Sequence, residues 1–351
     1  MSGGVDSSLA AALLKEAGHE VVGITLHLWD EDETRLSESM CCSQEMTDSA
    51  RRVAAQLGIG YYVFNYQREF RRHVIETFLD GYAQGYTPNP CLACNRDIKF
   101  RALLNRADAL GFDYVATGHY ARIAAREDGY TLLRGVNVDK DQSYMLYMLG
   151  QPELRRLMFP IGELSKTEVR ELARARGLAS ADRPESQDIC FVPGGDYRNL
   201  LREERPASLV PGPIVDAAGN TVGQHGGLPL YTVGQRRGLG VATGSAVYVT
   251  GHDLARNTLV VGPAETLRRA TLRAHGVVYT PGAPVEPFVC SVQLRSHADA
   301  VAATVEPMAA GQALVRFTEP QRAVAPGQAV VFYDGDTVIG GGLIATFGAE
   351  Q

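Results

Sequence analysis

Residues 2–8 read Ser2-Gly3-Gly4-Val5-Asp6-Ser7-Ser8, and the helical pattern LAAALLKEA at 9–17 follows directly. Small glycines let successive backbone N–H groups converge on one anion. The helix that follows adds unpaired N–H groups and a dipole that favours negative charge. We therefore expect this loop to bind the phosphates of a nucleotide, with Asp6 as a ligand of the accompanying Mg²⁺. An ordinary Gly/Ser turn that caps a helix is the alternative.

The loop lacks the lysine of the GxxxxGK[ST] phosphate loop, so it is a nucleotide loop of another class. In a doubly wound nucleotide fold a buried strand normally leads into the phosphate loop. No residue of this sequence precedes Met1. We therefore expect either that the first strand lies upstream of the sequence or that another segment takes its position.

Helix and strand patterns alternate over the first half of the chain. Strands are expected at 21–29, 61–65 and 114–117, and helices at 46–57, 69–82 and 98–110. A loop that contains two prolines is expected at 85–94. Strands separated by helices indicate an α/β fold with a doubly wound parallel sheet, which binds ligands beyond the C-terminal ends of its strands.

The pattern changes near residue 205, where prolines and glycines interrupt the chain up to residue 229. Beyond them lie short β-type runs at 246–250, 258–261, 288–294, 313–317, 329–333 and 337–339. We predict a nucleotide-binding domain at 1–205, a small linker domain at 206–265 and a closed β-barrel at 266–351.

Composition limits the classes of function. No stretch approaches the ~20 apolar residues of a membrane span, and no basic-then-apolar signal segment is seen, so we expect a cytoplasmic protein that has no contact with a membrane. The net charge of −6 is unevenly spread: residues 30–48 hold seven acids and one arginine, whereas 66–106 hold seven Lys/Arg and four acids. Because local basic surface decides contact with phosphates, the total charge does not exclude RNA.

Six cysteines without a secretory signal favour thiol chemistry or metal binding over a disulfide framework. Cys91 and Cys94 form a C-x-x-C motif, which is compatible with a redox pair, half of a zinc site or part of an iron–sulfur site. Cys190 stands alone in SQDICF. Cys290 lies in a predicted barrel strand, where a cysteine commonly serves as a small buried hydrophobe.

Several long motifs carry a resemblance to a known family. They are SGGVDSS (2–8), TPNPCLACNRDIKF (87–100), ATGHYAR (116–122), KDQSYMLYML (140–149), FPIGELSKTEVR (159–170), SQDICF (186–191), TVGQRRGLG (232–240) and APGQAVVFYDGD (325–336). In these motifs, their order and their spacing, the chain resembles the tRNA-specific 2-thiouridylases of the N-type ATP pyrophosphatase (PP-loop) superfamily. These enzymes place sulfur on the wobble uridine of certain tRNAs.

The resemblance implies a reaction in two stages. ATP and Mg²⁺ at the loop 2–8 would adenylate the C2 oxygen of the uracil, with loss of pyrophosphate, because that oxygen is a poor leaving group. Sulfur would then attack C2. In the family one cysteine carries persulfide sulfur from a donor protein, such as a persulfide carrier or a cysteine desulfurase relay, and this position corresponds to Cys190. A second cysteine that assists release corresponds to Cys94.

The resemblance also implies the binding residues. Leu26 and Gly118 would line the nucleotide beside the loop 2–8. The residues expected to contact tRNA are Asn89, Pro90 and Cys91 at the target base, His119, Lys140, Asp141 and Gln142, and, in the barrel, Arg295, Ser296 and Gln328.

The sequence departs from the family pattern at Cys91, where many members have an aspartate. With Cys94 and Cys190 it creates a set of three thiols. Three cysteine ligands with one open iron site suit a 4Fe–4S cluster that binds hydrosulfide as the sulfur source. A persulfide enzyme and a cluster-dependent enzyme both remain open from the sequence.

Two rival functions also remain open. Another PP-loop enzyme could adenylate a carbonyl for attack by ammonia or an amine, as a ligase or amidotransferase, and would not need Cys94 or Cys190. A non-enzymatic RNA-binding module could use the loop 2–8 as a helix cap and the cysteines for a structural metal.

Overall fold

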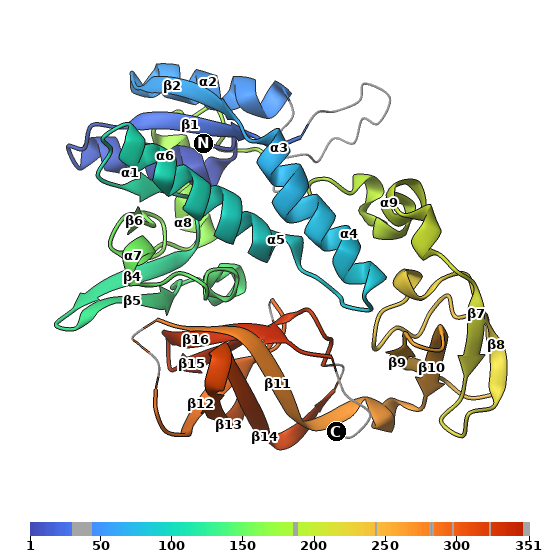
Figure 1. The fold of residues 1–351 in the computed structure, drawn as a ribbon. Coiled ribbons are helices and arrows are strands. Elements are labelled where there is room, and N and C mark those ends of the chain that lie inside the picture. The colour runs from blue at the N-terminus through green and yellow to red at the C-terminus, as the bar shows by residue number, and fades with distance from the viewer. Residues whose placement is uncertain are drawn as a thin grey trace.

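The computed structural model describes residues 1–29, 44–184, 189–242, 244–280, 282, 284–296, 298–322 and 324–346. Figure 1 shows an α/β domain above a β-barrel, with a small β domain beside them. The α/β class and the closed barrel predicted from the sequence are confirmed.

The strands of the α/β domain pair in parallel. Strand β1 (Val22–His27) pairs with β2 (Gly60–Asn65), and β3 (Val115–Ala116) pairs with β6 (Leu157–Met158). Within the described residues these pairs form separate sheets. Met1 lies beside β1, because its amine donates to Ile24 O and its carbonyl accepts from Thr25 Oγ1 (2.5 Å). The start of the phosphate loop is therefore fastened to the edge of β1.

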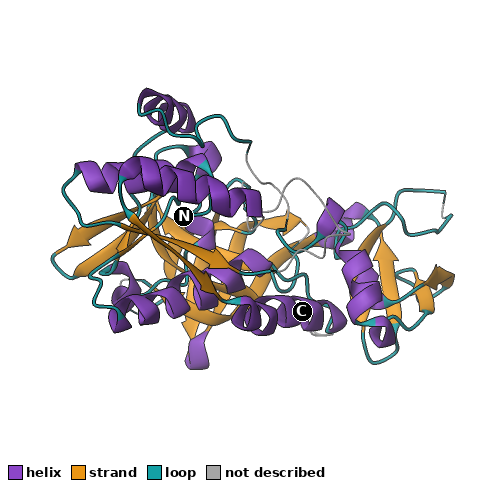
Figure 2. Cartoon of the chain, turned by 90° about the horizontal axis from the view of Figure 1, so that it is seen from above, coloured by secondary structure: helices purple, strands orange, loops and turns teal. Residues whose placement is uncertain are grey.

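Helix α2 (Gln44–Leu57) packs on β1 and β2, and α1 (Val5–Glu16) packs against α2 and α8 (Lys166–Ala175). The predicted helix at 69–82 is a longer helical run of α3 (Gln67–Phe70), a π-helical stretch (Arg71–Ile75) and α4 (Glu76–Ala83). Helix α7 (Gln151–Leu154) follows β5, and α9 (Tyr197–Glu204) leads out of the domain. Figure 2, seen from above, shows how helices lie against strands in the molecule.

The prediction of a loop at 85–94 is wrong beyond Asn89, where the chain becomes helical. Helix α5 (Pro90–Ala93) starts there and continues as a π-helical stretch (Cys94–Ala102) into α6 (Leu103–Ala109). The physical reason is local: the side chain of Asn89 accepts from Cys91 N (3.1 Å), and Pro90 takes the first helical position, where a missing N–H costs nothing. The prolines therefore start a helix at this point.

The α/β domain also contributes a hairpin that the sequence reasoning missed. Strands β4 (Ala121–Arg126) and β5 (Gly129–Arg134) pair in antiparallel fashion, and Leu133 of β5 pairs with Thr337 of the barrel strand β16. Arg122 adds an ion pair to Asp336 (2.8 Å). The hairpin joins the two domains through one continuous sheet.

The small domain holds strands β7 (Gly212–Val215), β8 (Thr221–His225), β9 (Tyr248–Asp253) and β10 (Thr258–Gly262) in the sheet order β8-β7-β10-β9. Its own apolar core contains Ile214, Val249 and Leu259.

The barrel contains β11 (Arg268–Tyr279), β12 (Phe288–Gln293), β13 (Val301–Met308), β14 (Gln312–Arg322), β15 (Ala329–Asp334) and β16 (Thr337–Ile344). Pairing of β11 with β16 closes it. Strands β11 and β13 lie outside the predicted runs, because polar and charged residues limit their continuous apolar stretches to three residues at one end of each strand.

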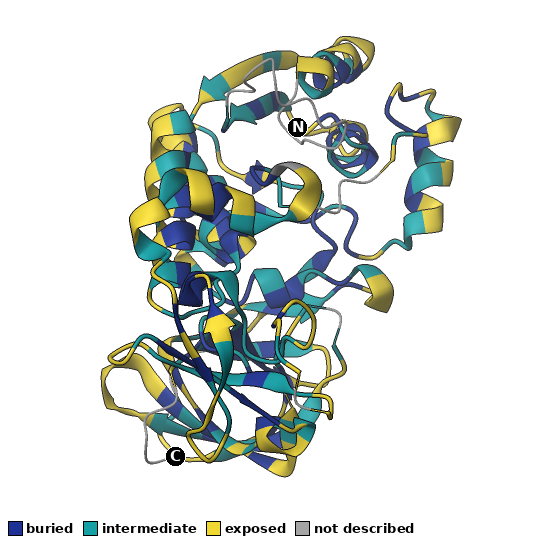
Figure 3. Ribbon diagram, turned by 90° about the vertical axis from the view of Figure 1, so that its right-hand side faces the viewer, coloured by how far each residue is buried: buried dark blue, intermediate teal, exposed yellow. Residues whose placement is uncertain are grey.

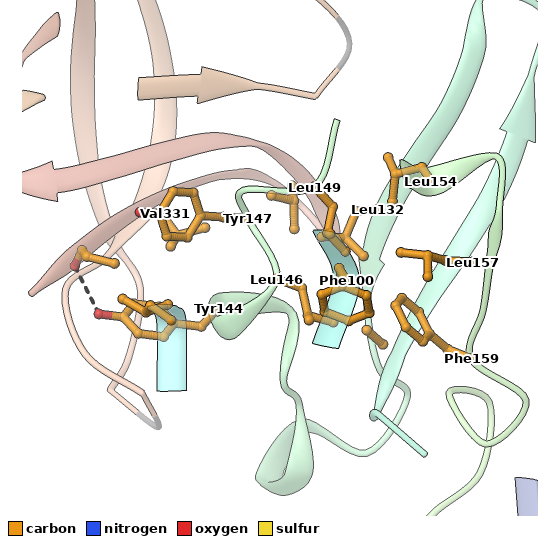
Figure 4. Packing of buried hydrophobic residues seen from close by; sticks show 14 of the residues in the cluster. Phe100, Leu132, Tyr144, Leu146, Tyr147, Leu149, Leu154, Leu157, Phe159 and Val331 are labelled. Carbon is orange, nitrogen blue, oxygen red and sulfur yellow. Dashed lines mark hydrogen bonds between the residues drawn. The ribbon is translucent and has the colours of Figure 1, made fainter. Parts of the chain in front are cut away.

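One apolar core is shared by the α/β domain and the barrel. Phe100, Tyr144, Leu146 and Tyr147 pack with Val331 of β15, and Tyr144 Oη donates to Ala329 O (2.9 Å), as Figure 4 shows. Figure 3 shows the buried residues that continue from one domain into the other. No helix within the described ranges is both long and apolar enough to cross a membrane.

Candidate active site

The phosphate loop has a fixed backbone. Gly3 has φ +75°, and a Cβ there would overlap the carbonyl oxygen of Met46, so only glycine fits. Ser2 N donates to Ser7 Oγ (3.0 Å), and Ser8 Oγ donates to Gly4 O (2.8 Å). Gly4 is the N-cap of α1 and supplies no side-chain cap. The N–H groups of the first turn of α1 are therefore arranged to receive an anion.

Asp6 is held by partners that the sequence reasoning did not identify. Lys166 Nζ donates to both carboxylate oxygens of Asp6 (2.8 and 2.9 Å), and Tyr120 Oη donates to Oδ1 (2.7 Å). Tyr120 lies in the motif ATGHYAR and Lys166 in FPIGELSKTEVR. The sequence therefore marked both residues as members of family motifs, but it gave neither of them a role. Lys166 brings to this site the positive charge that the loop itself lacks.

The N-terminus of α8 places Lys166. Ser165 and Glu168 form a capping box, in which Ser165 Oγ accepts from Glu168 N (3.2 Å) and Glu168 Oε2 accepts from Ser165 N (2.7 Å). This reciprocal cap fixes the first turn of α8 and with it the start of the Lys166 side chain.

A single carboxylate beside the N–H groups of the first turn of α1 suits Mg²⁺, which commonly takes one or two carboxylates together with substrate phosphates. Asp6 therefore fits the metal expected from the sequence. Lys166 already balances the charge of Asp6, so a metal ion would have to share that carboxylate or displace the lysine.

Gly118 lies directly against this loop. A Cβ at Gly118 would lie 2.6 Å from the carbonyl carbon of Asp6 and 2.7 Å from Ser7 N. Leu26, on β1, is half-buried and packs against the apolar cluster that contains Cys94. Of the two residues expected to line the nucleotide, Gly118 therefore adjoins the phosphate loop and Leu26 adjoins the apolar cluster of the cysteines.

The structure brings Cys94 and Cys190 to one apolar cluster, which is built around Phe70, Phe78 and Phe191. Cys94 is 8% exposed, Cys190 is half-buried, and Cys91 is exposed. Each of these described cysteines lies outside any disulfide. Ser186, Gln187 and Asp188 of the SQDICF motif lie outside the described residues.

Within the described ranges, no three His, Cys, Asp or Glu side chains lie close enough together to hold a metal ion. The three thiols therefore do not form the ready-made 4Fe–4S site that the sequence left open, and we derive no step through such a cluster. Cys290 is buried in the barrel, as expected, and burial raises the pKa of its thiol to about 12.

The segment 85–95, which we call the cysteine loop although it becomes helical at Pro90, contacts Met145 of the KDQSYM segment (140–145). Asn89 Nδ2 lies 3.6 Å from Met145 Sδ, and Asn95 Nδ2 donates to Met145 O (3.1 Å). Asn95 Oδ1 is buried without a hydrogen-bond partner in the described part of the chain. Asn89 and Asn95, which flank the two cysteines in the sequence, therefore both contact Met145.

Within that segment, Asp141 is buried and accepts from Gly135 N (2.9 Å), Ser143 N (3.0 Å) and Arg134 (3.0 Å). Gln142 accepts from Tyr120 N (3.0 Å), and Lys140 is half-buried beside them. These contacts shape the segment, and its contact with tRNA stays a prediction.

His119 is buried between Phe100 and Phe159, and its Nδ1 lies 2.7 Å from Thr117 Oγ1. Burial, with a smaller effect from Lys99, lowers the pKa of His119 to about 3. The imidazole is therefore neutral at physiological pH.

The residues of the barrel that are expected to contact tRNA follow Cys91 and Cys94 by about two hundred residues or more in the sequence. Arg295 is exposed and donates to Arg322 O (3.2 Å), and Ser296 is half-buried. Gln328 donates to Thr87 O (2.6 Å), which places it against the cysteine loop.

Ion pairs take up part of the basic stretch 66–106. Arg71 pairs with Glu204 and Glu76, and Arg96 and Arg101 both pair with Asp97. Its net attraction for RNA is therefore smaller than the count of basic residues suggests.

Comparison with known proteins places the whole chain in one family. The family described as tRNA methyl transferase HUP domain matches residues 1–194, the tRNA methyl transferase PRC-barrel domain matches 198–263, and the aminomethyltransferase beta-barrel domain matches 269–344. The tRNA-specific 2-thiouridylase MnmA of Roseiflexus sp. (strain RS-1) is 68% identical, covering 98% of this chain and 98% of its own length.

The protein of the same name from Chloroflexus aurantiacus (strain ATCC 29366 / DSM 635 / J-10-fl) is 64% identical, over 98% of this chain and 97% of its own length. That from Moorella thermoacetica is 51% identical over 98% of each chain. With such identity over nearly its entire length, and with the phosphate loop and both cysteine motifs in place, the chain belongs to the tRNA-specific 2-thiouridylase family of enzymes.

Proposed function

We propose that the protein uses ATP and Mg²⁺ to replace the C2 oxygen of the wobble uridine in tRNA by sulfur. The observation that carries the proposal is the packing of Cys94 and Cys190, far apart in the sequence, on one apolar cluster together with Leu26 of β1. This packing supports the proposal, because it gathers two thiols and a residue of β1 that the resemblance assigns to the nucleotide.

In the first stage the C2 oxygen of the uracil attacks the α-phosphorus of ATP, and pyrophosphate leaves. The N–H groups at the start of α1 bind the phosphates, and Lys166 adds positive charge beside them. Asp6 would hold the Mg²⁺, which offsets the charge that develops on the departing pyrophosphate.

In the second stage the terminal sulfur of a persulfide on Cys190 attacks C2, and AMP leaves. The thiolate of Cys94 then attacks Sγ of Cys190 and breaks the S–S bond, which leaves 2-thiouridine and a Cys94–Cys190 disulfide. A thiol reductant restores both thiols, and a sulfur-donor protein reloads Cys190. The half-buried position of Cys190 is compatible with access for such a donor.

For tRNA, we propose that Asn89, Pro90 and Cys91 face the target base and that Lys140 and Arg295 bind the backbone. The wobble base would have to leave the anticodon stack to reach the largely buried Cys94. Binding should weaken as salt rises, because phosphate contacts release counterions.

Mass spectrometry of tRNA nucleosides after reaction with ATP, Mg²⁺ and a persulfide donor tests the proposal. We expect 2-thiouridine from the wild type and none from Cys190→Ser. Cys290→Ser is the matched control and should keep the activity, because its thiol is buried in the barrel.

Each rival predicts another outcome. Unchanged product formation by Cys190→Ser would point to a PP-loop ligase or amidotransferase that does not use the thiol. No tRNA-dependent pyrophosphate release would point to an RNA-binding module. Thiolation that requires bound iron, measured after anaerobic purification, would replace the persulfide route by the cluster route.

A further inference from the structure

The loop that leads into the cysteine motif is hydrogen-bonded to the barrel at Thr87. Thr87 N donates to Pro326 O (2.7 Å), and Gln328 Nε2 donates to Thr87 O (2.6 Å). Both polar groups of one peptide residue are therefore held by one turn, residues 325–328, of a different domain. We call this contact the barrel clasp.

The barrel side of the clasp is rigid. Gly327 N donates to Ile344 O (2.8 Å), and Ile344 N donates to Gln328 O (2.8 Å), so the turn is fastened to the end of β16. Gly327 has φ +87°, and a Cβ there would lie 2.9 Å from Tyr86 Cβ and 3.1 Å from Thr87 N. Only glycine lets the two backbones approach this closely.

The loop side leads directly to the chemistry. Asn89 follows Thr87 by two positions, caps α5 and lies against Met145. Helix α5 then runs into Cys94 without a break. A displacement of Thr87 is therefore passed to the start of α5 and to the thiol.

The start of the loop and the turn of the clasp border an open space. A cavity of about 390 Å³ at the junction of the three domains is lined by Gly85, His252, Arg269 and Pro326, among others. On the other side Tyr86 N donates to Gly81 O (2.9 Å), and Pro88 lies 3.0 Å from the position that a Cβ at Gly81 would take. The two hydrogen bonds of Thr87 to the barrel therefore fix this loop on the side that faces the turn 325–328.

We propose that Gln328 is a positioning residue, which acts through Thr87 to hold Asn89, Cys91 and Cys94 in the geometry for reaction. The kinetic part of this inference rests on the proposed thiolation, whereas its structural part does not. It differs from the expectation that Gln328 binds tRNA directly.

The test compares Gln328→Glu with Gln321→Glu. The carboxylate at 328 keeps the size of the side chain and cannot donate to Thr87 O. Gln321 lies on the same barrel, on β14, where its side chain donates to Glu319 O (2.7 Å), so the control makes the same charge change away from the clasp.

We expect Gln328→Glu to speed hydrogen exchange at Thr87 roughly three- to tenfold, in keeping with the net free energy of one hydrogen bond. Site-resolved alkylation of Cys94 by iodoacetamide should rise in parallel. In thiolation assays kcat should fall while the dissociation constant of tRNA stays within twofold of the wild type. Gln321→Glu should match the wild type in every measurement.

Unchanged exchange at Thr87 and unchanged alkylation of Cys94 would overturn the proposal. So would a loss of tRNA affinity equal to that of Arg295→Ala with the loop unperturbed, which would make Gln328 a direct tRNA contact. If exchange and alkylation respond but the wild type makes no 2-thiouridine, the clasp stands and the proposed function fails. Should Gln328→Glu fail to fold, Gln328→Asn breaks the same hydrogen bond with a shorter neutral side chain.

Discussion

Lys166 supplies the positive charge beside the proposed phosphate site. Its ammonium is largely buried, with 13% of the side chain exposed, and it contacts both oxygens of Asp6. A cation fixed beside the first turn of α1 can attract the phosphates of ATP at the same time as it balances Asp6.

Lys166→Met should therefore weaken MgATP binding roughly tenfold or more, since a charge-assisted contact contributes about 1.5–3 kcal/mol. Isothermal titration with MgATP and with AMP measures the effect, and the loss should be larger for MgATP. Lys166→Arg, which keeps the charge, is the control. Equal affinity of Lys166→Met and the wild type for MgATP would show that the lysine serves Asp6 alone.

His119 gives a prediction for pH. Its folded pKa of about 3 lies below the ordinary value of 6.5, so between these values the unfolded chain binds one more proton than the folded protein. Stability from this residue is therefore complete above pH 6.5 and falls by about 1.4 kcal/mol per pH unit as the pH drops below it.

Urea unfolding between pH 7 and pH 5 should show a steeper loss of stability for the wild type than for His119→Gln. Other buried histidines contribute equally to both proteins and cancel in the comparison. Parallel slopes would mean that His119 takes up a proton in the folded state.

At the scale of elements, the segment after β3 approaches the start of α1 closely at Gly118, beside the proposed nucleotide site. Gly118→Ala would place a methyl group 2.6 Å from backbone atoms of Asp6, which cannot move without shifting the phosphate loop. We expect MgATP affinity to fall at least tenfold, with a loss of stability of about 1–3 kcal/mol from overpacking.

Gly251→Ala is the control for that substitution, because a Cβ at Gly251 meets nothing within 4 Å. Nucleotide titration and thermal unfolding of the two variants measure both effects. Normal MgATP binding by Gly118→Ala would contradict the role assigned to this close approach.

The elements also show what the sequence could predict. The apolar run of β1 and the amphipathic pattern of α2 placed the ends of both within two residues, because both patterns lie within the element itself. The segment after Asn89 was misjudged because prolines read as breakers unless a cap precedes them. The hairpin of β4 and β5 pairs with β16 of the barrel. Because β16 lies about two hundred residues further along the chain, no local sequence pattern could predict this pairing.

The same limit applies to the site. The phosphate loop and the cysteine motifs could be identified from local residues. The pairing of Asp6 with Lys166, and of Gln328 with Thr87, joins segments that only the folded chain brings together.

At the scale of the molecule, the shared core predicts joint unfolding of the α/β domain and the barrel. Leu146 is fully buried in that core, whereas Leu259 is fully buried in the separate core of the small domain. Leu146→Ala should cost about 2–5 kcal/mol and lower protection from hydrogen exchange in both large domains.

Leu259→Ala should lower protection in the small domain alone. Hydrogen exchange followed by mass spectrometry resolves the three regions in one experiment. Loss of protection confined to the α/β domain in Leu146→Ala would show that the two cores unfold independently.

The shared core also has a consequence during synthesis on the ribosome. Phe159 and the residues before it leave the exit tunnel long before Val331 and Val338, which complete their packing. At about 5–20 residues per second the delay is roughly 10–35 s. For that time we expect the face of the α/β domain that these barrel strands cover to stay exposed on the nascent chain.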